Sequence, residues 1–329
     1  MSESTPTIVN LLIYSISAND PALPELEEAV SLDLGVMADL GKLMMSAWNS
    51  HTDNWTVSMY LDMYPTHYII KLSKTNGQVQ IIRTEVLQQD KHIKAKDRIG
   101  SFISKNYLHT NGVNAFIIGG HGDIINGKPY YSPVSLLENT LLENNKIDNI
   151  SIEELAKTIM ETLKKPKPFA FVCLDACGLA TLETVSQLKD TTDWLMAYPD
   201  YTPWNGFVNI DVIDICCQCL SKNVSVQECL SKVVMKYTLY SESQEDPSGV
   251  TVFHTQFVDQ LSNIVTKLVS EDNNKQKEPV DLLTYIETKL NNLDFQEFKK
   301  IFDKVVVSYK IPWNNHLREN PLSETGIYL

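Results

Sequence analysis

The chain has 329 residues, 43% of them hydrophobic, which is long enough for one large α/β domain or a domain with an appendage. Lysine and arginine total 28 against 41 aspartates and glutamates, and the resulting net charge is −13. No dense basic run alternates with aromatic residues, so we expect no nucleic-acid partner, which would need positive charge along its phosphates.

Cysteine usage and hydropathy bear on the compartment. The six cysteines do not form two Cys-x-x-Cys pairs, or one pair with a matching His pair, as a structural zinc site needs, and they are too few for a disulfide scaffold. The N-terminal apolar run at 8–16 is too short to span a bilayer and follows no basic region. We therefore expect no metal, no membrane segment and a cytoplasmic location, with secretion as the alternative if a leader was removed.

Short apolar runs alternate with longer amphipathic windows, a pattern typical of parallel strands covered by helices. Residues 67–84 alternate on both sides of Asn76-Gly77, which predicts a β-hairpin at an edge of the sheet. The other elements expected in the first part of the chain are strands at 8–16, 55–63 and 113–120, and helices at 25–48 and 90–109.

The polar segment from 123 to about 150 has few periodic apolar residues and is expected to be a surface loop. Ser151 and Glu154 have the spacing of a capping box, which predicts a helix over 151–165. A strand at 169–176, a helix at 178–190 and a strand at 193–199 should follow. Later windows read as helices, at 211–220, 226–237, 253–269, 280–290 and 294–309. This order predicts a core over 1–240 and a mostly helical subdomain over 241–329.

Two of the buried strands lead directly into reactive side chains, each followed by glycine: His121-Gly122 and Cys177-Gly178. Ligands bind beyond the carboxyl ends of parallel strands, so neighbouring strands would bring both side chains to one crevice. Taken singly, Cys177 would more often be an inert buried thiol and His121 a hydrogen-bonded loop residue. Their joint occurrence favours a catalytic thiol, for which a distant Cys and His brought together by the fold are expected.

These two runs, ending in His-Gly and in Asp-Ala-Cys, resemble the caspase-like cysteine peptidases. DACGLATLETVSQLKDTTDWLMA, at 175–197, is similar to the clostripain family in particular, and PWNGF, at 203–207, resembles a turn that follows in that family. Weaker similarity extends to IYSISANDPALPELEEA near the N-terminus and to GIYL at the end, whereas GGHGD departs from the family's usual approach to His-Gly. The resemblance implies a caspase-like α/β fold, a mostly parallel central sheet sandwiched by helices, with a largely helical C-terminal portion.

The resemblance also implies a function, a cysteine endopeptidase that acts on peptides or proteins and cleaves after Arg or Lys. Cys177 would be the nucleophile that forms a thioester acyl-enzyme, and His121 would be the general acid/base. The backbone N–H groups of Gly122 and Cys177 would form the oxyanion hole. Asp175 would bind the basic P1 side chain, because on an extended backbone it shares the face of Cys177, unless it caps a helix instead. Asp200 and Trp204 are further candidates for that subsite.

Maturation in similar enzymes implies autoprocessing after a basic residue in the 123–150 loop, for which Lys146 and Lys128 are the candidates. No cofactor is expected, and calcium stays open as an activator although no EF-hand pattern is present. Two other functions stay open: a catalytically silent caspase-like scaffold or regulatory module, and a thiol amidase that acts on a non-peptide amide. The remaining cysteines are expected in the core, at positions 173, 216, 217, 219 and 229.

Overall fold

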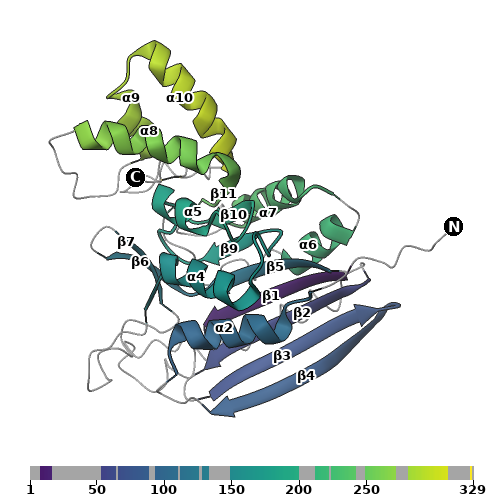
Figure 1. The fold of residues 1–329 in the computed structure, drawn as a ribbon. Coiled ribbons are helices and arrows are strands. Elements are labelled where there is room, and N and C mark those ends of the chain that lie inside the picture. The colour runs from purple at the N-terminus through teal and green to yellow at the C-terminus, as the bar shows by residue number, and fades with distance from the viewer. Residues whose placement is uncertain are drawn as a thin grey trace.

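A nine-stranded sheet forms the centre of the protein, in the order β12-β11-β10-β9-β5-β1-β2-β3-β4 (Figure 1). The computed structural model describes residues 8–16, 53–63, 66–88, 93–109, 112–125, 128–132, 149–199, 212–221, 224–241, 249–271, 281–309 and 327. The five central strands are parallel: β2 (Trp55–Met63), β1 (Ile8–Ile16), β5 (Gly112–Gly119), β9 (Val172–Asp175) and β10 (Trp194–Ala197). The fold is therefore the predicted α/β architecture with a mostly parallel sheet.

Helices cover both faces of this sheet (Figure 1). On one face lie α2 (Ala95–Asn106), α4 (Ile152–Leu163) and α5 (Leu182–Leu188), and on the other lie α6 (Val212–Ser221) and α7 (Val226–Ser241). Three later helices pack beside α5 and the far end of the sheet: α8 (Val258–Glu271), α9 (Leu282–Glu287) and α10 (Asn292–Val305).

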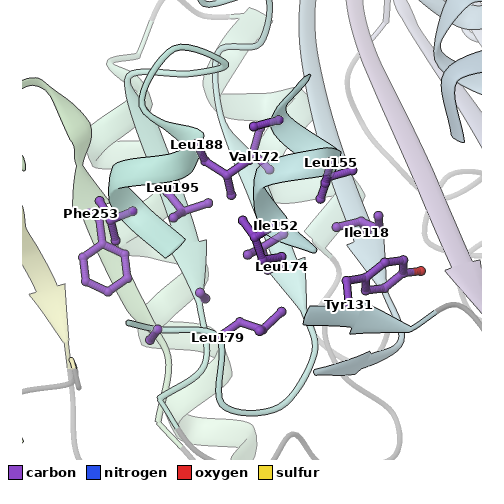
Figure 2. Close-up of a cluster of buried hydrophobic side chains, with 14 of the residues drawn as sticks. Ile118, Tyr131, Ile152, Leu155, Val172, Leu174, Leu179, Leu188, Leu195 and Phe253 are labelled. Atoms are coloured by element: carbon purple, nitrogen blue, oxygen red, sulfur yellow. The ribbon is translucent and has the colours of Figure 1, made fainter. Parts of the chain in front are cut away.

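The strand alternation divides the core into two hydrophobic clusters, one on each face of the sheet. On β9, Val172 and Leu174 belong to the cluster beneath α4 and α5, whereas Cys173 belongs to the cluster beneath α6 and α7. Figure 2 shows the first cluster, in which Val172 and Leu174 lie among Leu155, Leu188 and other apolar side chains. Because both faces are buried, the central strands read as continuous apolar runs in the sequence.

Several local predictions are confirmed. The hairpin is formed by β3 (Thr66–Thr75) and β4 (Gln78–Gln88) at one edge of the sheet, with Asn76 and Gly77 both at positive φ. The capping box is also present, since the Ser151 hydroxyl accepts a hydrogen bond from the Glu154 N–H at 3.1 Å. The strands predicted at 8–16 and 55–63 have these bounds, and the helix predicted at 25–48 lies outside the described residues.

Two predictions about secondary structure are wrong. The segment predicted as a surface loop contains three strands, β6 (His121–Ile125), β7 (Lys128–Ser132) and β8 (Ile150–Ser151), which pair into a second, small sheet. The helices predicted at 253–269 and 294–309 are too long, because the start of the first belongs to strand β11 (Thr251–His254) and the end of the second to strand β12 (Val306–Tyr309). Four residues are too few to show a period of two, so the conformation is decided by strand pairing, of β11 with β10 and of β12 with β11.

The C-terminal part of the chain is thus helical except for two strands that extend the main sheet, β11 antiparallel to β10 and β12 antiparallel to β11. The boundary at residue 240 stays a prediction. Across the described ranges, no helix has the length and apolar character needed to cross a membrane.

Candidate active site

The strands that lead to His121 and Cys177 lie side by side, which is the condition under which the sequence predicts both side chains in one crevice. β5 and β9 pair in parallel with Gly119 opposite Asp175, and the Gly120 N–H donates to the Asp175 carbonyl at 3.0 Å. Both strands end there, so His121 and Cys177, each two residues beyond its strand, emerge at the same edge of the sheet. In an open parallel sheet this edge is where ligands bind.

Gly122 lies directly against the backbone of Cys177. A Cβ placed on Gly122 would be 2.0 Å from the Cys177 carbonyl oxygen and 2.8 Å from Cγ of Leu179. Only glycine, which has no Cβ, fits this separation without a backbone shift. The structure therefore brings the His-Gly and Cys-Gly segments, 177 − 121 = 56 residues apart in the sequence, into van der Waals contact.

Cys177 differs from the other five cysteines in its exposure. It lies in a turn after the end of β9, is partly exposed, and precedes Gly178, whose φ of +64° is the left-handed conformation that glycine favours. His121 is exposed and begins β6. The partly exposed Cys177 thiol, near the exposed segment that carries His121, can therefore contact a substrate, whereas a buried thiol cannot.

The remaining cysteines belong to the core, as predicted, and they are chemically quiet. Burial raises the pKa of the Cys173 and Cys217 thiols well above the ordinary value, and it raises that of Cys219 to about 11. A hydrogen bond with Cys216, together with burial, raises the pKa of Cys229. At neutral pH the thiols of Cys173, Cys217, Cys219 and Cys229 are protonated and therefore poor nucleophiles.

The geometric argument for Asp175 requires a correction. β9 ends at Asp175 and Cys177 lies in a turn, so the backbone between them is not extended and strand alternation does not align their side chains. Tyr198 and Cys173 lie in the cluster under α6 and α7. Their own burial is the main cause that raises the pKa of each, and the charge of Asp175 is the second cause. The half-buried carboxylate is thus close to that face, and its role in substrate binding stays a prediction.

The candidate processing residues have different surroundings. Lys128 is exposed but lies in β7, paired with Ile125, and its charge opposes the burial that raises the pKa of Glu183 on α5. Lys146 lies outside the described residues, as do Asp200 and Trp204. Within the described ranges, His, Cys, Asp and Glu side chains form no group of three or more that could hold a metal ion.

The sequence reasoning missed the β6–β7 hairpin and with it Tyr131. The buried Tyr131 pairs with Gly122 across the two strands and donates its hydroxyl to the Gly119 carbonyl at 2.8 Å. A signal was present, because Asn126-Gly127 between two five-residue segments is the same turn pair that identified the hairpin at 67–84.

Solved structures of similar fold come from bacterial cysteine proteases. An inactive zymogen of a C11 protease from Parabacteroides distasonis has a TM-score of 0.67 and 16% identity, with 99% of this chain and 92% of that chain covered. A secreted C11 cysteine protease from Bacteroides thetaiotaomicron has a TM-score of 0.69 and 14% identity, covering 99% and 93%. A secreted C11 cysteine protease from Bacteroides thetaiotaomicron in complex with an irreversible peptide inhibitor has a TM-score of 0.65 and 17% identity, covering 92% and 84%.

At these identities the structural likeness shows the fold alone. No curated protein matches the sequence. The model of the clostripain family matches residues 36–324, which include both strand ends described above. The protein therefore belongs to the clostripain family of cysteine proteases.

Proposed function

We propose that the protein is an endopeptidase in which Cys177 and His121 form the catalytic dyad. The contact of Gly122 with the Cys177 carbonyl carries this proposal, because it joins the two segments at one edge of the sheet. Cys177 is also the cysteine whose exposure suits a nucleophile, whereas the other five lie in the core.

In the proposed reaction, Sγ of Cys177 bonds to the scissile carbonyl carbon and the C–N bond breaks, which leaves a thioester. His121 gives the leaving amine its proton, and water then cleaves the thioester to release the acid and the thiol. The backbone N–H groups of Gly122 and Cys177 are proposed to stabilise the oxyanion.

We further propose cleavage after Arg or Lys, with Asp175 as the carboxylate that binds the basic side chain. Its half-buried position supports this role, since partial desolvation strengthens an ion pair with a guanidinium group. Asp200 and Trp204 complete the proposal for this subsite. The peptide inhibitor bound to the Bacteroides protease supports a peptide substrate here.

Autoprocessing is proposed at Lys146 in preference to Lys128. Lys128 belongs to β7, which is paired with β6. The strand would have to separate from β6 before the peptide bond after Lys128 could enter an active site. Calcium is proposed as an activator. For the location, cytoplasmic and secreted forms are the two candidates, and the secretion of the Bacteroides thetaiotaomicron protease favours the second.

The test is hydrolysis of fluorogenic peptides with Arg, Lys, Asp or Leu at P1, with and without calcium. We expect cleavage after Arg and Lys that is lost in Cys177→Ala and in His121→Ala, and retained in the control Cys217→Ala, whose thiol is buried. Iodoacetamide should label only Cys177 in the native protein, because the other five cysteines are buried and out of reach of the reagent. A protein that is folded and fully processed but cleaves no peptide of the panel would support the scaffold alternative. Cleavage of non-peptide amides alone would support the amidase alternative.

A further inference from the structure

The short turn that carries His121 and Gly122 away from the sheet is held from two sides. On one side the Gly120 N–H donates to the Asp175 carbonyl of β9. On the other side the Tyr131 hydroxyl donates to the Gly119 carbonyl, at 2.8 Å. The peptide groups just before His121 are therefore fixed by one partner from the nucleophile's strand and one from the β6–β7 hairpin.

Tyr131 is itself firmly anchored. Its side chain is fully buried, and Figure 2 shows its ring beside Ile118 of β5 in the hydrophobic cluster under α4. Its backbone lies between two strands, opposite Gly122 on β6 and opposite Ile150 on β8. A rigid ring held in this way places its hydroxyl with little freedom to adjust.

We propose that Tyr131 is a positioning residue for catalysis, which sets His121 at the distance from the scissile bond that proton donation requires. This assignment rests on the proposed function, in which His121 protonates the leaving amine. The residue acts at both ends of the turn, through its hydroxyl on Gly119 and through its strand pairing on Gly122. Displacement of a catalytic group by about 1 Å can cost about 100-fold in rate, so loss of one fixing hydrogen bond should be measurable in kcat.

The matched variants are Tyr131→Phe and Tyr107→Phe. Each removes only a hydroxyl from a buried tyrosine that donates to a backbone carbonyl, since Tyr107 donates to the Pro168 carbonyl at 2.9 Å and also lies near the Lys165 amine. Tyr107 and Pro168 precede β5 and β9, so this second bond lies at the opposite ends of the same two strands. Similar small losses in Tm are expected from both variants, and only Tyr131→Phe should affect catalysis.

The decisive readout compares two substrates of identical peptide sequence, an amide and a 4-nitrophenyl ester. The amine leaving group of the amide needs a proton from His121, whereas nitrophenolate leaves without one. For Tyr131→Phe we expect kcat on the amide to fall by about tenfold, with KM within about twofold and a much smaller loss on the ester. His121→Ala should show the same selectivity for the amide with a larger loss.

Equal losses on amide and ester, or a kcat for Tyr131→Phe equal to that of Tyr107→Phe, would overturn the role of Tyr131. If His121→Ala fails to reduce amide cleavage, the dyad assignment itself is wrong, and Tyr131 loses its role with it. If His121→Ala is impaired and Tyr131→Phe is not, the dyad stands and only the positioning role is lost.

Discussion

Gly122 approaches the carbonyl of Cys177 too closely to admit a side chain. The Gly122→Ala substitution would put its Cβ within 2.0 Å of that oxygen, and because a backbone atom stands in the way, one of the two segments must move. We expect kcat/KM to fall by at least about 100-fold, the order of loss that a 1 Å displacement near the reaction produces. The measurement is steady-state hydrolysis of the preferred fluorogenic peptide, with circular dichroism to verify the fold.

Gly77→Ala provides the control at the same scale. Gly77 has φ of +75° in the hairpin turn, and a Cβ there would meet nothing within 4 Å. This substitution should cost about 1 kcal/mol of stability through backbone strain while leaving activity intact. If Gly122→Ala keeps activity within a few-fold of the wild type, close contact between the two segments is not required for catalysis.

Among the elements, β1, β5 and α2 are joined by a buried network of amides. The Asn114 side chain accepts from Asn10 Nδ2 at 2.7 Å and from the Leu108 N–H at 2.9 Å, and it donates to the Leu108 carbonyl at 2.8 Å. Asn114→Ala would leave the N–H and carbonyl of Leu108 without this partner and would remove one of the two acceptors of Asn10 Nδ2, the other being the Asn106 carbonyl. We expect a loss of about 2–4 kcal/mol in the free energy of unfolding, measured with urea.

Asn291→Ala is the comparison for this network. Asn291 is exposed and caps α10 by accepting from the N–H groups of Leu293 and Asp294, both at 3.0 Å. Water can replace the lost side chain there, so the cost should be only about 1 kcal/mol. An Asn114→Ala variant no less stable than Asn291→Ala would show that the buried network contributes little.

How far the elements could be predicted depends on where their information lies. The capping box at Ser151 and the turn at Asn76-Gly77 depend only on residues close together in the sequence, and both predictions are confirmed. The strands that lead to His121 and Cys177 were also predictable, because each is a continuous apolar run, whereas their pairing as neighbours is a property of the sheet that neither run encodes. The contact of Gly122 with Cys177 is different, because it depends on how the β6–β7 hairpin folds over the end of the sheet.

At the scale of the whole molecule, β11 pairs with β10 and β12 pairs with β11, so two strands from beyond residue 240 belong to the main sheet. Phe253 on β11 is completely buried in the same cluster as Leu174 on β9. The sequence could not reveal this, since a four-residue strand beside a strong helical pattern has no periodicity of its own. The consequence is that strands from both sides of residue 240 share one core.

This shared core predicts a single cooperative unfolding transition. Phe253→Ala, although it lies in the C-terminal part, should lower the free energy of unfolding by about 3–5 kcal/mol and reduce the temperature of thermal inactivation equally. Leu293→Ala on α10 is the control, because its side chain is 76% exposed and its removal should change stability by at most about 0.5 kcal/mol. Calorimetry and residual peptidase activity, measured on the same heated samples, would decide. Two separate transitions, or a Phe253→Ala protein that loses helix signal at a temperature where the active site still works, would instead make residues 241–329 an independent subdomain.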